Sequence, residues 1–372
     1  MIELMRANGW AWGLQCADAR EALRAMPDES VHCCITSPPY WGLRSYIQNG
    51  DPLKPFEIGL EPTPEKYVEN LVEVFVEVRR VLRPDGTLWL NLGDCYATGG
   101  GKVGEHPGGG QQGARWKGEI GRHRDDLRRN HNGLDRPSNV PLNVGRGVHT
   151  AENAGKHASA VAQMGPMTQP NRMPIEGLKP KDLVGAPWRV AFALQASGWY
   201  LRSDIIWFKG NPLPESVQDR PTKAHEYVFL FSKNERYYYD SAAIAEPATS
   251  RRPSGNGFAG RQGGSARVGP QSGGQGSLQK WEDVGGTRNR RTVWQVNTKP
   301  FKDAHFATWP PDLIEPMILA GCPRGGIVLD PFVGSGTTIL VALRNGRQAI
   351  GIDLNPAYVQ MAKARIEGIE AQ

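Results

Sequence analysis

The spacing of hydrophobic and polar positions predicts a helix near residue 70. From Thr63 to Leu82 apolar side chains recur every three or four positions, as on one face of an amphipathic helix. Thr63 and Pro64 suit the N-cap and the first turn of this helix. Pro84 and Gly86 predict where it ends. A second helix is predicted over 182–198, where the apolar spacing is again helical.

Short apolar runs between these helices predict strands. The runs cover residues 31–35, 87–94, 200–210, 225–233, 327–329 and 348–352. Helical spacing returns at 337–346, between the last two runs. Strands that alternate with helices indicate an α/β fold with a largely parallel sheet. The strand at 225–233 is expected at an edge of this sheet.

Two long segments lack any sustained hydrophobic periodicity. Residues 99–172 hold 11 Lys and Arg against 6 Asp and Glu, and residues 246–292 hold 8 against 3. Because the whole chain has a net charge of +6, its excess positive charge lies in these two glycine-rich segments. Such segments do not pack a core of their own, and their charge favours contact with nucleic acid over a linker role. The expected organisation is 1–98, 99–172, 173–245, 246–292 and 293–372, with the second and fourth parts as insertions.

Composition narrows the class of protein. The chain of 372 residues has room for one large domain or two ordinary ones. No run of 18 apolar residues occurs, so no membrane span is expected. The five cysteines form no C-x-x-C pair, so we expect neither a metal site nor disulfides, and a cytoplasmic location fits.

A rigid corner follows the first predicted strand. The stretch "TSPPYW" begins at Thr36, and its adjacent prolines exclude both a helix interior and a central strand. The carboxyl ends of strands are where open α/β sheets bind ligands. Ser37 supplies a hydroxyl at this corner, Pro38 a fixed carbonyl, and Tyr40 an aromatic face.

A βαβ unit near the other end of the chain predicts a second binding element. The strand at 327–329 ends at Asp330, a glycine turn with Gly334 and Gly336 leads into a helix, and the next strand ends at Asp353. The glycines allow a ligand to approach the backbone, and an acidic residue at this distance suits ribose hydroxyls. The third glycine of a dinucleotide fingerprint is missing, which favours a nucleoside such as S-adenosylmethionine over NAD or FAD. Asp330 would bind the ammonium of its amino acid or order the loop.

Together, "TSPPYW", "LDPFVGSGTT" and "GIDLNPAY" resemble the DNA amino-methyltransferases, which methylate N4 of cytosine or N6 of adenine. The order of the motifs, catalytic first and cofactor last, is similar to the beta group of that family. "CADAREALRAMPDESV" and "HFATWPPDLIEPMI" resemble two further family segments. The resemblance implies a circularly permuted Rossmann-like methyltransferase sheet with helices on both faces and two Gly-rich basic insertions. Target recognition is then expected in 246–292, with 99–172 sharing the work.

The resemblance also implies site residues. The catalytic group would be Ser37, Pro38, Pro39 and Tyr40, which clamp a flipped base, while Trp41 is expected in the core. S-adenosyl-L-methionine would be bound by Asp18, Phe306, Pro310, Asp330, Pro331, Phe332, Gly334, Ser335, Gly336, Thr337, Thr338, Asp353 and Asn355. No metal is expected.

Double-stranded DNA is the implied partner, and a cognate restriction endonuclease is a possible one; the protein would be cytoplasmic, DNA-associated, and encoded by a bacterium or a phage. The chain would act as a monomer or a homodimer. Ser37 favours N4 of cytosine, with N6 of adenine as the alternative. A non-catalytic DNA-binding relic, a dinucleotide oxidoreductase and a methyltransferase for RNA or protein amides also stay open. The 5-carbon cytosine enzymes are set aside, because their Pro-Cys nucleophile does not occur here.

Overall fold

The computed structural model of the chain describes residues 4–7, 9–97, 175–212, 214–248, 286–298 and 309–368. They fall into two units, one of Met1–Tyr239 with Thr292–Gln372 and one of Asp240–Arg291. In the second unit β7 (Glu246–Pro247) pairs antiparallel with β8 (Thr287–Arg288). The insertion predicted at 99–172, and most of the one at 246–292, lie outside the described residues.

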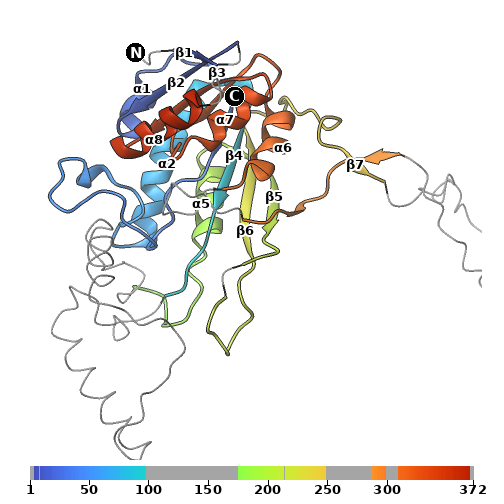
Figure 1. Cartoon of the computed structure of the whole chain (residues 1–372). Coiled ribbons are helices and arrows are strands. Elements are labelled where there is room, and N and C mark those ends of the chain that lie inside the picture. Colours follow the sequence, from blue (N-terminus) through green and yellow to red (C-terminus); the bar gives the residue numbers. More distant parts are fainter. Residues whose placement is uncertain are drawn as a thin grey trace, which may run out of the picture. The chain divides into compact units, whose positions relative to one another are not determined.

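The larger unit is built on one mixed sheet (Figure 1). In the described part of the chain the sheet has nine strands in the order β1-β2-β11-β10-β3-β4-β6-β5-β9. Their bounds are β1 (Met5–Ala7), β2 (Trp10–Cys16), β3 (Val31–Thr36), β4 (Leu82–Leu92), β5 (Tyr200–Phe208), β6 (His225–Ser232), β9 (Val293–Gln295), β10 (Ile327–Asp330) and β11 (Gln348–Asp353). The five strands from β2 to β4 in this order are parallel, and β6 runs antiparallel to both β4 and β5.

The middle of the sheet joins the two ends of the sequence. The late strands β10 and β11 lie between the early strands β2 and β3, with Val328 paired to Cys33 and Ala349 to Trp12. This is the permuted arrangement that the motif order predicts. It places the carboxyl end of β10 beside that of β3, although 294 positions separate the two in sequence.

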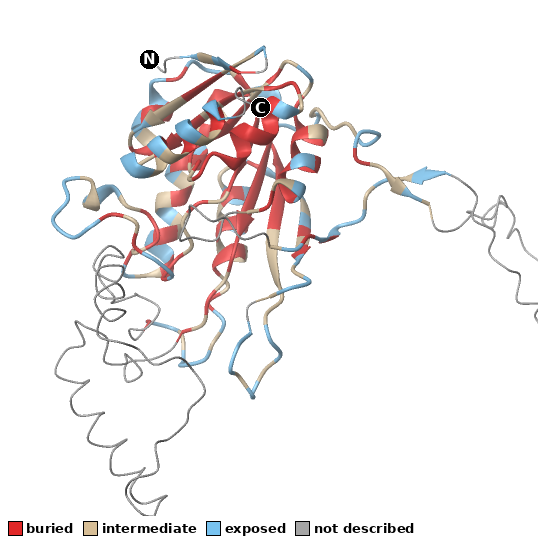
Figure 2. Cartoon of the chain, viewed as in Figure 1, coloured by how far each residue is buried: buried red, intermediate tan, exposed pale blue. Residues whose placement is uncertain are grey.

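Helices form two layers around the sheet. Their bounds are α1 (Ala19–Arg24), α2 (Pro64–Val81), α5 (Ala186–Ala196), α6 (Pro311–Gly321), α7 (Thr337–Arg344) and α8 (Pro356–Glu367). Helix α2 contacts both α1 and α5 in one layer, and α7 contacts both α6 and α8 in the other. The strands between them are largely buried (Figure 2). Because β3 leads to α2 and β10 to α7, the chain leaves these adjacent strands toward different layers, and open α/β sheets bind ligands at the carboxyl ends of such strands.

The predicted elements are confirmed in type, with differences in extent. Thr63 caps α2 by accepting a hydrogen bond from the backbone of Lys66 at 3.2 Å. Pro84 and Gly86 were predicted to end this helix; α2 does end just before them, at Val81, and both residues lie inside β4, where its pairing with β3 shifts register. The edge position predicted for 225–233 is wrong, because β6 pairs on both sides. The strands β1, β2 and β9 were not predicted.

Candidate active site

The rigid corner follows the carboxyl end of β3 and is held in place by neighbouring residues. Pro38 is buried, and the Pro39 carbonyl accepts a hydrogen bond from the Tyr67 hydroxyl at 2.9 Å. Gly59, with φ of 107°, packs so closely that an added Cβ would lie 3.1 Å from Cβ of Pro39. Among the described residues none donates to the Pro38 carbonyl. The two prolines therefore differ. The Pro39 carbonyl accepts a hydrogen bond within the fold, whereas the Pro38 carbonyl remains available as an acceptor for a ligand.

A polar network lies beside the corner and orients Ser37. Asn91 on β4 donates from Nδ2 to the Tyr227 carbonyl at 3.0 Å and to Glu226 at 3.3 Å. Both partners accept only, so the amide nitrogen must face them and Oδ1 must face the corner. Ser37 Oγ lies 3.2 Å from this Oδ1 and therefore donates its proton there. The lone pairs of Ser37 Oγ are left as acceptors.

The Tyr40 ring is fixed at its edge and at its hydroxyl. The hydroxyl contacts Oδ1 of Asn91 at 2.9 Å and the Glu226 carboxylate at 2.7 Å. Gly93 lies against the ring edge, where an added Cβ would overlap the ring carbons. Burial, and then the charge of Glu226, raise the pKa of the Tyr40 phenol well above its usual value. The phenol therefore stays protonated and acts as a hydrogen-bond donor.

Asp330 joins the corner to the glycine turn. Its carboxylate accepts from the Thr36 hydroxyl at 2.6 Å, from the Thr338 hydroxyl at 2.6 Å and from the Phe332 backbone at 3.1 Å. The residue is only 1% exposed, and this burial raises the pKa of its carboxyl to about 6. Its contacts match the loop-ordering role, the second of the two predicted roles.

The two glycines of the turn differ in their surroundings. Gly334 has φ of 50° and no atom within 4 Å of an added Cβ, so its backbone borders open space. Gly336 has φ of 78°, and an added Cβ would lie 3.0 Å from Cβ of Ala362 on α8. We predicted that both glycines serve ligand approach. The backbone of Gly334 borders the space that such an approach needs. Gly336 also packs α7 on α8, and its contact with a ligand stays a prediction.

Ser335 and Thr337 face α8. Arg365 donates to the Ser335 carbonyl at 3.1 Å, to the Ser335 hydroxyl at 3.1 Å and to the Thr337 hydroxyl at 2.8 Å. These contacts attach the turn to α8. The same turn passes over β11, where a Cβ on Gly351 would come within 2.7 Å of Val333.

Two predicted acidic residues lie at the carboxyl ends of adjacent strands: Asp353 ends β11, and Asp18 follows β2. Asp353 accepts from the backbones of Gly334 at 2.9 Å and Asn355 at 2.8 Å, and burial raises the pKa of its carboxyl to about 6. Asp18 caps α1 through the backbone of Arg20 at 2.9 Å. It also pairs with the Arg20 guanidinium at 2.9 Å, a partner that the sequence does not reveal.

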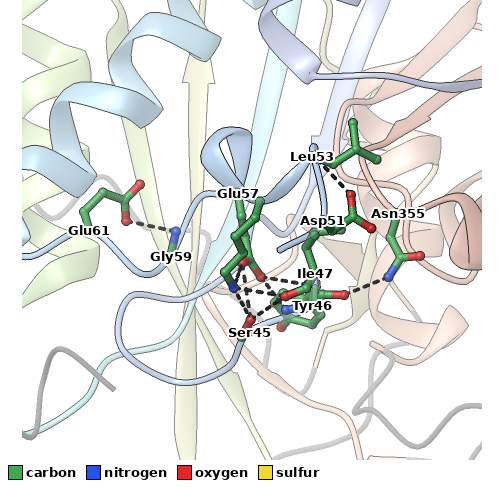
Figure 3. Close-up of polar contacts among 10 residues, drawn as sticks. Ser45, Tyr46, Ile47, Asp51, Leu53, Glu57, Gly59, Glu61 and Asn355 are labelled. Carbon is green, nitrogen blue, oxygen red and sulfur yellow. Dashed lines mark hydrogen bonds and ion pairs between the residues drawn. The ribbon is translucent and has the colours of Figure 1, made fainter. Parts of the chain in front are cut away.

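The loop that follows the corner is built around one carboxylate (Figure 3). Glu57, whose side chain is 4% exposed, accepts from the backbones of Tyr46 and Ile47, from the Ser45 hydroxyl and from the Lys54 ammonium. These contacts fold residues 45–57 into a fixed unit with the 3-10 helix η1 (Lys54–Phe56).

This loop reaches the cofactor motif. Asn355 donates from Nδ2 to the Tyr46 carbonyl at 2.9 Å (Figure 3). The rings of Tyr46 and Tyr358 pack edge to face with centroids 6.2 Å apart. The loop therefore connects the end of β3 with the start of α8, on the side where Asp353 lies. Neither Glu57 nor Tyr46 was predicted as a site residue.

Comparison with known proteins identifies the family. The family model described as DNA methylase, N6_N4_Mtase, matches residues 31–364. The chain belongs to this family. This DNA methylase is 42% identical over 352 residues to the Type II methyltransferase M.XycI of Xanthomonas campestris pv. cyanopsidis. The alignment covers 94% of this chain and 86% of that protein. The chain is 39% identical over 365 residues to the Type II methyltransferase M.SmaI of Serratia marcescens, which covers 98% and 94%.

The fold of this DNA methylase also matches a solved structure. The PvuII DNA methyltransferase (cytosine-N4-specific) aligns with a TM-score of 0.53 and 17% identity, over 97% of this chain and 91% of that one. The family resemblance predicted from the three motifs is confirmed, and so is the methyltransferase-type α/β sheet.

Four further residues were predicted as cofactor contacts: Phe306, Pro310, Pro331 and Phe332. Pro310 precedes α6 as its N-cap, Pro331 is buried, and Phe332 is half-buried beside the core. Phe306 lies outside the described residues. Trp41 is buried and donates to the Glu61 carbonyl at 2.9 Å, so the core role predicted for it is confirmed.

Sequence reasoning missed Asn91, Lys209 and Glu226. Asn91 had a signal, because it is a polar residue inside an apolar strand. In the described part of the chain, no three His, Cys, Asp or Glu residues form a metal-type cluster. The helices described here include none with the length and apolar character of a membrane span.

Proposed function

We propose that this DNA methylase transfers a methyl group from S-adenosyl-L-methionine to the exocyclic amino nitrogen of a base flipped out of duplex DNA. N4 of cytosine is the favoured acceptor, because Ser37 opens the corner, and N6 of adenine is the alternative. The observation that carries the proposal is the Thr36–Asp330 hydrogen bond of 2.6 Å. It joins the corner and the glycine turn at adjacent strand ends, so a base and a nucleoside cofactor can meet there.

The residues present fit the cofactor. Gly334 offers backbone beside open space. Asp353 accepts two backbone hydrogen bonds, and a carboxylate has about four acceptor positions, so capacity remains for ribose hydroxyls. When bound, S-adenosyl-L-methionine supplies an electrophilic methyl group on its sulfonium. Asp18, Pro310 and Asn355 are proposed contacts around it, and Asp330 is proposed to hold the turn in shape.

The corner would prepare the base for attack. The lone pair of an exocyclic amino group is delocalised into the ring, which makes the nitrogen a weak nucleophile. Ser37 Oγ, whose proton is directed to Asn91, and the Pro38 carbonyl can accept the two amino hydrogens and turn the lone pair toward the methyl donor. Rigid placement of these acceptors is where the rate gain lies. Tyr40 is proposed to stack on the extruded base.

Partners and organisation follow from this activity. We propose that 1–98, 173–245 and 293–372 make the catalytic domain, and that 99–172 and 246–292 contact DNA. The relatives named Type II methyltransferases support a restriction endonuclease as the cognate partner. Action on cellular DNA would place the protein in the bacterial cytoplasm, as a monomer or a homodimer.

The test is methylation of duplex DNA by the purified chain with labelled S-adenosyl-L-methionine, followed by digestion to nucleosides and mass spectrometry. We expect N4-methylcytosine. N6-methyladenine would overturn the choice of base, and label on RNA or protein but not on DNA would overturn the substrate. No transfer at all, with the cofactor bound, would favour a non-catalytic relic.

A further inference from the structure

A carboxylate on β6 lies directly behind the corner. The Glu226 side chain is 16% exposed and receives three donors from three other segments. Lys209, just after β5, contacts it at 2.5 Å, the Tyr40 hydroxyl at 2.7 Å and the Asn91 amide at 3.3 Å. Lys209 is itself placed over the Trp207 ring, with 4.4 Å from Nζ to the centroid. An ion pair with Lys209 thus fixes the Glu226 carboxylate, which in turn accepts hydrogen bonds from Tyr40 and Asn91 of the candidate site.

These contacts restrict the Tyr40 ring. A carboxylate can only accept, so the Tyr40 hydroxyl is the donor in this bond. The hydroxyl is the atom of the ring farthest from the backbone, and fixing it limits rotation and tilt of the whole ring. Gly93 blocks movement at the ring edge. With its hydroxyl and its edge both fixed, the Tyr40 ring is preorganised for stacking before a base arrives.

The same carboxylate acts on Ser37 through Asn91. By accepting from Nδ2, Glu226 helps to point Oδ1 of Asn91 at the corner, where Ser37 donates to it. One carboxylate therefore sets both the aromatic face and the direction of the serine proton.

We propose that Glu226 is the positioning residue of the base clamp, and that it acts through the Tyr40 hydroxyl without touching the base. This inference rests on the proposed function and names a residue outside the two recognised motifs. The competing explanation is that Glu226 serves only its ion pair with Lys209, which connects β5 and β6. That explanation predicts a loss of stability with no link to Tyr40.

A double-mutant cycle separates the two explanations. The variants are Tyr40→Phe, which keeps the ring and removes the hydroxyl, Glu226→Gln, and both together. Each is assayed for kcat and KM on duplex DNA, for S-adenosyl-L-methionine affinity by calorimetry, and for melting temperature. Glu65→Gln is the matched control, because this carboxylate also pairs with a basic residue, Arg189, at 2.7 Å but is 60% exposed on α2.

We expect Tyr40→Phe and Glu226→Gln each to lower kcat roughly ten- to hundred-fold, the scale for a displaced catalytic contact. The double variant should match the slower single variant to within about twofold, because both changes act on the same hydrogen bond: Phe removes its donor, and Gln replaces its charged acceptor by an amide that Lys209 also faces. Cofactor affinity and the control should stay at the wild-type level. If the two losses multiply in the double variant, Glu226 does not act through Tyr40 and the inference is wrong.

Two further results keep the test decisive. If Glu226→Gln does not fold, Glu226→Asp takes its place in the cycle, since it retains the charge for Lys209 and is one methylene too short for Tyr40. Wild-type kcat in Glu226→Asp would overturn the inference. Absence of transfer to DNA by the wild-type chain would instead overturn the proposed function, which separates the two failures.

Discussion

Replacing Thr36 by Val tests the bond that joins the two halves of the site. Thr36 is fully buried, and its hydroxyl donates to the Asp330 carboxylate at 2.6 Å. Val keeps the shape of the side chain but offers no donor to a buried charge. A hydrogen bond to a charged group contributes about 1.5–3 kcal/mol, and one to a neutral group about 0.5–1.5 kcal/mol. We therefore expect the free energy of unfolding to fall by about 1.5–3 kcal/mol near pH 8.

The stability difference between Thr36→Val and the wild type should become smaller as the pH falls. The pKa of Asp330 is raised to about 6 from 3.8, so the native protein takes up a proton at higher pH than the unfolded chain does. Asp330 thus makes the unfolding free energy rise as pH falls through 6 toward 4. Removing the Thr36 donor raises this pKa further, so the variant gains more from acidification. Near pH 5 the deficit should be about 0.5–1.5 kcal/mol.

Calorimetric unfolding at both pH values measures the effect, with Thr87→Val as the control. Thr87 is equally buried, but its hydroxyl lies 3.4 Å from the Gly321 carbonyl and 3.5 Å from the Cys33 thiol, which are uncharged. Thr87→Val should lower the free energy of unfolding by about 0.5–1.5 kcal/mol at both pH values. A Thr36→Val deficit that is the same near pH 8 and near pH 5 would refute the reasoning, because the buried charge would then not be the cause.

Other predictions address the clamp, the cofactor residues and the DNA segment. Tyr40→Ala should reduce methyl transfer roughly 5- to 150-fold, the value of about 1–3 kcal/mol for one stacked base, while calorimetry finds S-adenosyl-L-methionine affinity intact; normal turnover would argue against stacking. Asp353→Ala should weaken cofactor binding by about 1.5–3 kcal/mol in the same titration, and unchanged affinity would mean that the site is misplaced. Gly336→Ala should lower the melting temperature more than Gly334→Ala, because only the former meets α8; equal melting temperatures would contradict this. Deleting residues 255–276 should change the sequence preference mapped on a randomised DNA library, and an unchanged preference would move recognition to 99–172.

Local sequence patterns were sufficient for the corner and the βαβ unit. Adjacent prolines and a glycine turn restrict the backbone within a few residues, so their geometry can be predicted without knowing the neighbours. The edge position predicted for 225–233 was wrong because it depends on distant parts of the sequence. Whether β6 pairs on one side or two depends on where distant strands lie, and an apolar run does not encode that.

The network behind the corner could not be predicted from the sequence. Asn91, Lys209 and Glu226 come from β4, the end of β5 and β6, and their meeting depends on the antiparallel register of these strands. The role of Gly336 likewise depends on where Ala362 packs. The motif residues could be proposed from the sequence because their pattern is local, whereas the residues that hold them in place are recognisable only after the sheet is assembled.

The strand order has a consequence for how the protein is made. During synthesis β2 and β3 leave the ribosome long before β10 and β11, the two strands that separate them in the sheet. Until then the facing edges of β2 and β3 lack their native partners, and such edges favour association with other chains. Long-range pairing of this kind also slows folding. The protein should therefore become active only after β10 and β11 have been synthesised, and separately expressed fragments divided within 299–308 should regain activity when mixed, because the fragment with β10 and β11 supplies the missing strands of the sheet.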